Sequence, residues 1–281
     1  MTGIAPAPFR PSVSMLGWAL NEEENLAEYA RKAEAFLRFV SDDFELVLVD
    51  DGSTDRTWEV ATELQRTRAW MRLIRNERNR GVGYNYARTI ASATKDYFLV
   101  QTLDWSYDIT ELGRSFHLLR TYDVLQGVRP GVFTLRGFRV RSDNLYKSFV
   151  STVNYLLIRI LFRLPLGDFQ NITVCPTRLG QKAHIEASSS FVNPEVLLKV
   201  WWQGASFKEI PVPFRRRERG RGTGTRVRSI LRSIRDIFRF WFLWVVLDRR
   251  PWKQRGRAVR LGEADALAES REAGAAGSMS V

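Results

Sequence analysis

The chain has 281 residues, of which 44% are hydrophobic and 26% charged, so it can form a large buried core and is neither disordered nor fibrous. Its 43 basic residues outnumber its 31 acidic ones, but 16 of the basic residues and only 3 acids lie between Phe214 and Arg260. This concentration of charge in one segment argues against a general nucleic-acid-binding surface. Because Cys175 is the only cysteine, an internal disulfide and a cysteine-rich zinc site are excluded.

The first half of the chain alternates short apolar runs with helical patterns. The runs lie at Val13–Leu16, Glu45–Val49, Arg72–Ile74, Tyr97–Val100 and Val124–Leu125. Apolar spacing between them predicts helices at Glu23–Val40, Asp55–Arg66, Tyr84–Ala93 and Ile109–Leu119. Strands alternating with helices in this way predict an α/β fold with a mostly parallel central sheet, covered by helices on both faces. In such sheets ligands bind beyond the carboxyl ends of the strands.

The second half predicts longer helices and one further strand. Helices are expected at Arg141–Arg163, Pro194–Trp202 and Val227–Leu247, and a strand at Phe207–Phe214. The longest uninterrupted apolar run, Phe240–Leu247, is too short for the roughly 30 Å core of a bilayer. We therefore expect no unaided membrane crossing, and the N-terminus lacks the pattern of a signal peptide.

Acidic residues gather directly after the first two apolar runs. Asn21 and Glu22 follow the first run, and Asp50, Asp51 and Asp55 follow the second. Carboxylates at this edge of the sheet can accept hydrogen bonds from a base or a ribose. The alternative is that the three aspartates only cap the next helix and interact with its dipole.

These strings and those that follow resemble the family-2 inverting glycosyltransferases of GT-A fold. Within that family the chain is most similar to the dolichyl-phosphate mannosyltransferase branch and its bacterial polyprenyl-phosphate relatives. The resemblance covers roughly residues 12 to 245 as an ordered series, which is more specific than any one motif. Its members are Asn21-Glu22-Glu23, Val49-Asp50-Asp51-Gly52-Ser53, Asn79-Arg80-Gly81, Ala93-Thr94-Lys95-Asp96, Val128-Arg129, Gly167-Asp168 and Glu209-Ile210-Pro211-Val212-Pro213-Phe214.

The resemblance and the composition together predict a division of the chain. It consists of an N-terminal extension (1–11), a GT-A catalytic domain (12–224), a basic amphipathic region at a membrane interface (225–260) and a flexible tail rich in Ala, Gly, Ser and Glu (261–281). The resemblance also implies a nucleotide-diphosphate sugar as donor. The residues expected around the nucleotide are Trp18, Leu20, Glu22, Val49, Asp51, Thr102 and Leu103, with Arg129, Arg217 and Arg226 at its phosphates. Guanidinium groups suit a diphosphate leaving group, and glycines between the arginines of 215–226 favour a lid over a solvated basic face.

The family's metal motif, D-x-D, aligns with Thr102-Leu103-Asp104, so its first acid is a threonine here. Asp104 falls at the position of the metal-ligating acid. If the stretch is extended, Asp104 and Ser106 point to one side and hold Mg²⁺ or Mn²⁺ with the diphosphate. Asp108 shares that spacing, but it is at least as well explained as a cap of the next helix.

The resemblance assigns the reacting centre to Asp104, Asp168 and Arg129. Gln170, Asn171 and Glu195 are expected to bind sugar or acceptor hydroxyls, although Glu195 is equally explained as a first-turn glutamate that favours the helix dipole. A lipid monophosphate acceptor is already largely dianionic at neutral pH, because its second pKa is about 6. Asp168 would then orient it, and a single displacement would invert the anomeric centre.

In the last predicted helix, arginines and aromatic residues alternate. This composition is typical of a helix in a membrane interface, although docking on the catalytic domain or on a partner's transmembrane helices would also use it. We therefore expect peripheral association with the inner face of the cell membrane and transfer to a polyprenyl phosphate, without nucleic acid. The alternatives are a saccharide or protein acceptor, and a non-catalytic nucleotide-binding module that assembles with an integral membrane partner.

Overall fold

The computed structural model describes residues 9–129, 145–213 and 227–248. The expected extension and the basic region therefore lie partly outside the described residues, and the expected tail lies wholly outside them. Arg217 and Arg226 are also outside. The expected division of the chain stays a prediction.

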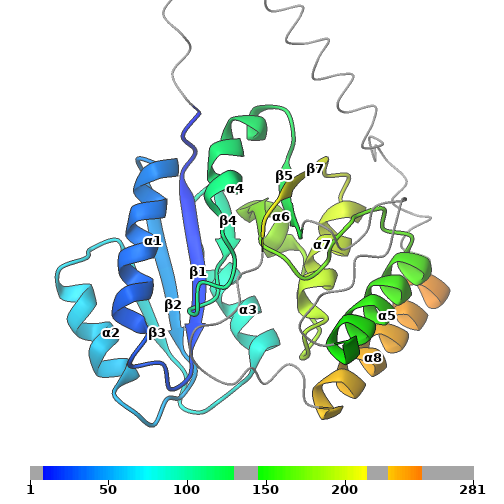
Figure 1. The fold of residues 1–281 in the computed structure, drawn as a ribbon, viewed down its shortest axis with the longest axis horizontal. Helices are drawn as coiled ribbons and strands as arrows, with labels where there is room; N and C mark the ends of the chain where they lie inside the picture. The colour runs from blue at the N-terminus through cyan, green and yellow to red at the C-terminus, as the bar shows by residue number, and fades with distance from the viewer. Residues whose placement is uncertain (1–8, 130–144, 214–226, 249–281) are drawn as a thin grey trace, which may run out of the picture.

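A seven-stranded sheet forms the centre of the molecule, in the order β3-β2-β1-β4-β6-β5-β7 (Figure 1). β1 pairs in parallel with β2 and β4, β2 with β3, and β5 with β7, whereas β6 is antiparallel to both of its neighbours. The expected mostly parallel sheet is confirmed. Its strands are β1 (Val13–Ala19), β2 (Phe44–Asp50), β3 (Met71–Arg75), β4 (Tyr97–Val100), β5 (Val124–Val128), β6 (Thr173–Pro176) and β7 (Phe207–Pro211).

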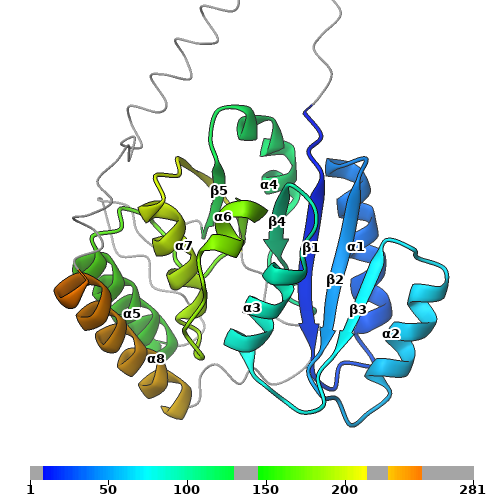
Figure 2. The same ribbon diagram turned by 180° about the vertical axis from the view of Figure 1, so that it is seen from behind.

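Helices cover both faces of this sheet, as Figures 1 and 2 show from opposite sides. The strands separate two cores because successive side chains alternate between the faces. In β1, Met15 packs into the core under α1 (Leu26–Val40), α2 (Thr57–Arg66) and α4 (Thr110–Arg114). Its neighbour Leu16 packs into the other core, with α3 (Val82–Ser92) and α7 (Val192–Trp202).

Three elements differ from the expectation. The helix expected at Ile109–Leu119 is short, because α4 gives way to the 3-10 helix η1 (Ser115–Arg120). Phe116 and Leu119 are both buried, and their spacing of three residues matches a 3-10 turn. Strand β6 and helix α6 (Thr177–Lys182) were not predicted, because a four-residue antiparallel strand and a one-turn helix carry almost no periodic signal.

The C-terminal helix packs on the domain and also keeps an exposed face. α8 (Val227–Phe240) continues as the π-helical segment η3 (Trp241–Leu247), and both pack against α5 (Leu145–Phe162), beside which α8 lies in both ribbon views. Ile237, Phe240 and Trp244 are buried in the shared core. Docking on the domain therefore accounts for one face of the helix.

The opposite face of the α5 and α8 pair remains open. It carries the exposed apolar side chains Leu156, Ile160, Leu231, Phe238, Phe242, Val246 and Leu247. Among the described residues, no helix is both long enough and apolar enough to span a bilayer.

Candidate functional site

A cavity of about 750 Å³ lies beyond the carboxyl ends of β1, β2 and β4. Parallel strands end together at this edge, so three loops that are distant in sequence meet there. Seven of the residues expected at the nucleotide and metal line it, namely Trp18, Leu20, Glu22, Asp51, Thr102, Leu103 and Asp104. The structure therefore brings most of the expected donor site together.

The same cavity is lined by residues that the sequence analysis did not assign to it. Most belong to motifs already noted. Their place in these motifs, beside residues assigned to the nucleotide, is the signal that could have identified them. Gln101 belongs to none of these motifs, and only its position directly after β4 could have indicated it. These additional residues are Asn21, Glu23, Glu24, Asn25, Asp55, Asn79, Gly81, Val82, Val100 and Gln101.

Trp18 forms an aromatic wall of the cavity. It is the last but one residue of β1, on the side of the sheet that faces α3, where its ring contacts the ring of Tyr86 with centroids 5.6 Å apart. Tyr86 is buried, and burial raises the pKa of its phenol. The tyrosine thus remains neutral and supports the indole from behind. This geometry leaves Trp18 suited to stacking on a planar base.

Asp51 holds the loop before α3 by direct hydrogen bonds at the cavity wall. Its carboxylate accepts hydrogen bonds from the Asn76 side chain (2.7 Å) and from the backbone N–H groups of Arg80 (2.8 Å) and Gly81 (3.1 Å). Asp51 is only 3% exposed. Its contacts hold the beginning of α3 at the cavity wall, where helix N–H groups favour an anion.

Of the two neighbouring aspartates, Asp55 caps the beginning of α2 as the capping alternative expected, whereas Asp50 closes a turn and pairs with Arg75 on β3 (3.1 Å). Asp50 accepts a hydrogen bond from the Ser53 backbone N–H (3.1 Å), and Asp55 accepts one from that of Thr57 (3.0 Å). Gly52 between them has φ +74°, and a Cβ there would come within 2.6 Å of the Arg78 backbone. Only glycine fits this turn. On the other wall, Glu22 accepts a hydrogen bond from the Asn25 side chain (2.6 Å).

The segment after β4 is a turn, so the extended arrangement expected for a shared metal site is wrong. Trp105 has φ +49°, a conformation that non-glycine residues rarely adopt. Ser106 is 3% exposed and is not among the residues that line the cavity. Asp108 accepts hydrogen bonds from the backbone N–H (3.2 Å) and the hydroxyl (2.7 Å) of Thr110 at the beginning of α4. The turn therefore leaves Asp104 alone of the three at the cavity.

Asp104 is held in place by its neighbours. Its Oδ1 accepts hydrogen bonds from the Thr102 hydroxyl (2.6 Å) and from the backbone N–H of Ser106 (3.1 Å). Among the described residues, no group of three His, Cys, Asp or Glu side chains is arranged around a metal position. One carboxylate is nevertheless enough for Mg²⁺, which proteins commonly bind with one or two carboxylates plus substrate phosphates. The residues present fit such an ion at Asp104.

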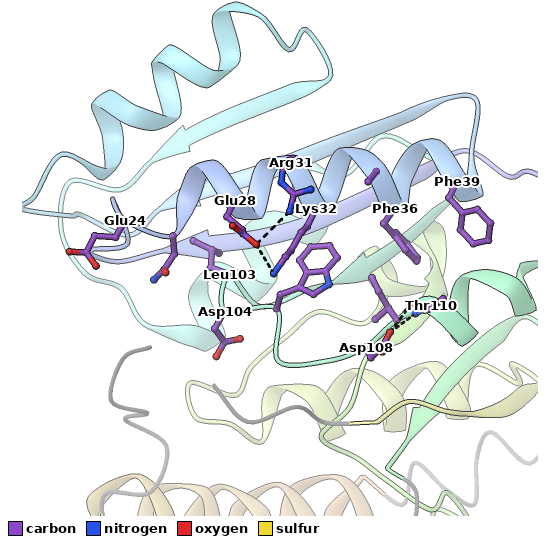
Figure 3. A pocket seen from close by; sticks show the side chains of 14 residues that line it. Glu24, Glu28, Arg31, Lys32, Phe36, Phe39, Leu103, Asp104, Asp108 and Thr110 are labelled. Atoms are coloured by element: carbon purple, nitrogen blue, oxygen red, sulfur yellow. Dashed lines mark hydrogen bonds and ion pairs between the residues drawn. The ribbon is translucent and has the colours of Figure 1, made fainter. Parts of the chain in front are cut away.

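A second cavity, of about 620 Å³, adjoins the first and shares Glu24, Asn25, Leu103 and Asp104 with it. It lies between α1 and the turn after β4 (Figure 3). Glu28 contacts both Lys32 (3.0 Å) and Arg31 (3.5 Å) on its wall. Glu28 thus offsets one of the two positive charges on this exposed face of α1.

Arg129 and Asp168 form a bidentate ion pair at the carboxyl end of β5. Nε of Arg129 lies 2.6 Å from one carboxylate oxygen and its Nη2 lies 2.9 Å from the other. Burial disfavours the charged guanidinium, but the adjacent carboxylate outweighs this effect and raises the pKa of Arg129 above its usual value. The pair connects to the turn after β4 because the Tyr107 hydroxyl donates to the Gln170 carbonyl (2.6 Å). Neither residue lines the nucleotide cavity.

Three expected contacts are not supported by the structure. Val49, in β2, is completely buried inside the protein and does not line the cavity. Asn171 is 5% exposed, and its amide is bonded to the Ile172 N–H and the Val212 carbonyl. Glu195 is 0% exposed, so it cannot bind a sugar. Gln170 stays a prediction, with its side chain donating to the Ser190 carbonyl (3.2 Å).

The curated proteins to which the chain is similar include two named as glycosyltransferases. A dolichol-phosphate mannosyltransferase of Pyrococcus furiosus is 25% identical over 204 residues, which are 72% of this chain and 55% of the relative. The low-salt glycan biosynthesis hexosyltransferase Agl6 of Haloferax volcanii is 29% identical over 122 residues, 42% of this chain and 27% of the relative. The chain thus spans about half or less of the length of these relatives.

Solved structures share the fold. The mannosyltransferase PcManGT of Pyrobaculum calidifontis, in complex with GDP-Man and Mn²⁺, has a TM-score of 0.56 at 16% identity, covering 96% of this chain and 78% of its own. Glucosyl-3-phosphoglycerate synthase of Mycobacterium tuberculosis, in complex with Mn²⁺, uridine-diphosphate and glucosyl-3-phosphoglycerate, has a TM-score of 0.55 at 16% identity. The match covers 81% of this chain and 80% of the synthase.

The family model described as glycosyl transferase family 2 matches residues 18–178, which are more than half of the chain and include the loops after β1, β2 and β4. The expected GT-A fold agrees with the solved neighbours. The chain belongs to glycosyl transferase family 2.

Proposed function

We propose that the chain transfers a sugar from a nucleoside-diphosphate donor to a polyprenyl phosphate at a membrane surface, with inversion at the anomeric carbon. The observation that carries the proposal is the cavity at the carboxyl ends of β1, β2 and β4, which combines an aromatic wall, a helix N-terminus and one held carboxylate. The family, the dolichol-phosphate mannosyltransferase relative and the neighbours solved with nucleotide donors support it.

In this proposal each wall of the cavity has a role. Trp18 stacks on the base, and the N–H groups at the beginning of α3 face the phosphates. Asp104 holds a divalent ion, Mg²⁺ or Mn²⁺, which supplies charge neutralisation for the departing diphosphate when bound. The neighbours solved with Mn²⁺ support a divalent metal without deciding between the two ions.

In this proposal the Arg129 and Asp168 pair, at the carboxyl end of β5, serves the acceptor. Because an incoming phosphate is already an anion, it needs orientation and charge compensation more than it needs a base. Arg129 provides the cation and Asp168 fixes the plane of its guanidinium group through two hydrogen bonds. A single displacement at the anomeric carbon then gives inversion.

The exposed face of the α5 and α8 pair supports a lipid acceptor. It carries apolar side chains, and Arg232, Arg235 and Arg239 lie exposed on α8 beside them. Apolar burial in the interface, together with about 1 kcal/mol of attraction for each nearby arginine on anionic lipid, would hold the domain at the surface. The active site would then lie near lipid phosphates.

The test is ligand-induced stabilisation of the purified protein. UDP, GDP and their sugars are added with and without Mn²⁺, and the melting temperature is measured. A donor that binds only the folded state raises it by mass action. We expect one base to stabilise the protein, and Mn²⁺ to increase the effect in the wild type.

Asp104→Asn provides the metal control. It should bind the same nucleotide without the additional gain from Mn²⁺, because an amide is a far weaker ligand for a hard cation than a carboxylate. No stabilisation of the wild type by any nucleotide would overturn the proposal. Nucleotide binding without transfer to any acceptor would identify a non-catalytic module, and transfer only to saccharides or proteins would exclude the lipid acceptor.

A further inference from the structure

Glu195, which is far too buried to bind a sugar, makes contacts that suggest another role. Its Oε1 accepts hydrogen bonds from the Lys199 ammonium (2.6 Å) and from the Glu186 backbone N–H (2.8 Å). Its Oε2 accepts one from the Ala187 backbone N–H (2.7 Å). Burial raises the pKa of Glu195, and the Lys199 cation and these hydrogen bonds offset only part of that effect.

Lys199 binds the same stretch of chain. Its ammonium group also donates to the His184 carbonyl (2.6 Å) and the Glu186 carboxylate (2.7 Å). It lies 4.7 Å from the ring centroid of Trp244, on η3. His184 has φ +44°, an unfavourable conformation for a non-glycine residue, and the bond from Lys199 helps to hold it there.

The segment held in this way, residues 184–191, packs against the donor side of the site. At Gly83, in the first turn of α3, a Cβ would come within 2.0 Å of the Ala187 carbonyl oxygen and 2.7 Å of the Ser188 Cα. Gly81 and Val82, directly before it, line the nucleotide cavity. The backbone of the segment is therefore packed directly against the first turn of α3, and a shift of the segment toward α3 would displace that turn.

The same segment also contacts the turn that contains Asp168. The Gln170 side chain donates to the Ser190 carbonyl (3.2 Å), and the Gln170 backbone N–H donates to Asp168 (3.0 Å). Residues 184–191 thus touch both the wall that faces the nucleotide and the turn that holds the Arg129 partner.

A buried ion pair adds little to stability by itself, because desolvation of both charges cancels most of their attraction. This pair does what apolar side chains could not, since it satisfies backbone groups of a segment that has no regular secondary structure. We propose that Glu195 and Lys199 are positioning residues of the transferase, which set the position of α3 at the donor site through residues 184–191. The inference rests on the proposed function.

The experiment compares Glu195→Gln with Glu45→Gln. Glu45 is a matched control because it is 3% exposed and accepts hydrogen bonds from the Ser14 hydroxyl (2.6 Å), Arg72 (2.9 Å) and the Thr94 N–H (2.7 Å). It lies at the amino end of β2, at the opposite end of the sheet from the cavity. Both variants should lower the melting temperature.

The first readout is amide hydrogen exchange of the free protein, which needs no ligand. Glu195→Gln should accelerate exchange at residues 184–191 and also at 80–83, whereas Glu45→Gln should leave both stretches unchanged. The second readout is the Kd for the stabilising nucleotide, which Glu195→Gln should raise about 10-fold, as expected when a binding group is misplaced by a fraction of an ångström. Gly83→Ala, which leaves the ion pair intact but displaces the segment, should raise the Kd similarly.

Unchanged exchange at 80–83 in Glu195→Gln would overturn the inference, and so would equal effects of the two glutamine variants on the Kd. If the wild type binds no nucleotide, the proposed function fails, but the exchange readout still decides whether Glu195 positions α3. The two failures are therefore distinguishable.

Discussion

Single residues at this site act mainly by holding other groups in place. Asp51 holds the beginning of α3, and Thr102 holds Asp104 with a 2.6 Å hydrogen bond. The threonine that replaces an acid of the family's metal motif thus has a structural contact of its own. One held carboxylate at the cavity is compatible with a metal whose other ligands come from the diphosphate.

Asp168→Asn separates the two classes of acceptor. If the acceptor is a phosphate, Asp168 only orients Arg129, and kcat should fall by less than about 100-fold, the lower end of what a general base contributes. Turnover is measured with a polyprenyl phosphate over a range of pH. The plot of kcat against pH for the wild type should show no pH-dependent fall that is missing from the plot for the variant.

The control for this variant is its folded fraction, measured by circular dichroism at the assay temperature. Removing one partner of a buried ion pair costs about 3–5 kcal/mol of stability. A fall in kcat of about 10⁴-fold in fully folded protein would instead make Asp168 a base and the acceptor a hydroxyl group.

At the scale of elements, the pair of α5 with α8 and η3 has two faces with different partners. Phe240 and Trp244 both stack on the ring of Phe191 in the domain, with centroids 5.8 and 6.2 Å away, and Ile237 is buried in the same core. The other face exposes Phe238 (47%) and Phe242 (50%). The apolar side chains of α8 and η3 therefore form two faces, one packed on the domain and one exposed.

Replacing both Phe238 and Phe242 with Ser should weaken binding to vesicles of phosphatidylcholine and phosphatidylglycerol in equal amounts. Burial of a phenylalanine side chain contributes about 1.5–3 kcal/mol, so we expect at least a 10-fold loss of affinity in a sedimentation assay. Wild-type binding should also weaken as salt is added, because the arginines contribute.

Phe39→Ser is the matched control, since Phe39 is equally exposed (52%) but lies on α1. It should bind vesicles like the wild type. Equal losses in the two variants, or no binding of the wild type at low salt, would contradict a membrane role for the α5 and α8 face.

At the scale of the whole molecule, the two ends of the sheet have different tasks. The carboxyl ends of the strands carry the cavity, whereas Glu45 at the other end connects three strands and the segment before β4. Burial tends to raise the pKa of Glu45, but hydrogen bonds from Ser14, Arg72 and Thr94 outweigh it and lower that pKa. The ionised carboxylate is therefore the form that the fold favours.

This gives a pH dependence of the free energy of unfolding. A lowered pKa contributes stability above the unfolded value, about 4.3 for Glu, and that contribution is lost as the pH falls through the folded value. Glu45→Gln should be less stable than the wild type by about 1–3 kcal/mol at pH 7 in urea unfolding. The difference should narrow below about pH 4; a difference that stays constant with pH would contradict the assignment.

The sequence by itself determined the strand and helix alternation of the first half, because buried parallel strands and amphipathic helices leave strong local patterns. The resemblance to family-2 glycosyltransferases, carried by the order of motifs along the chain, indicated Trp18, Glu22, Asp51 and Asp104. The alternation of strands and helices indicated only that a ligand site should lie at the carboxyl ends of the strands.

Only the tertiary structure decided where side chains end up relative to one another. It placed Glu195 in a buried ion pair, buried Ser106 outside the cavity lining, and paired Arg129 with Asp168. It also inserted β6 antiparallel between β4 and β5. These features depend on contacts between residues far apart in the chain, and local sequence patterns carry no record of which buried charge meets which partner.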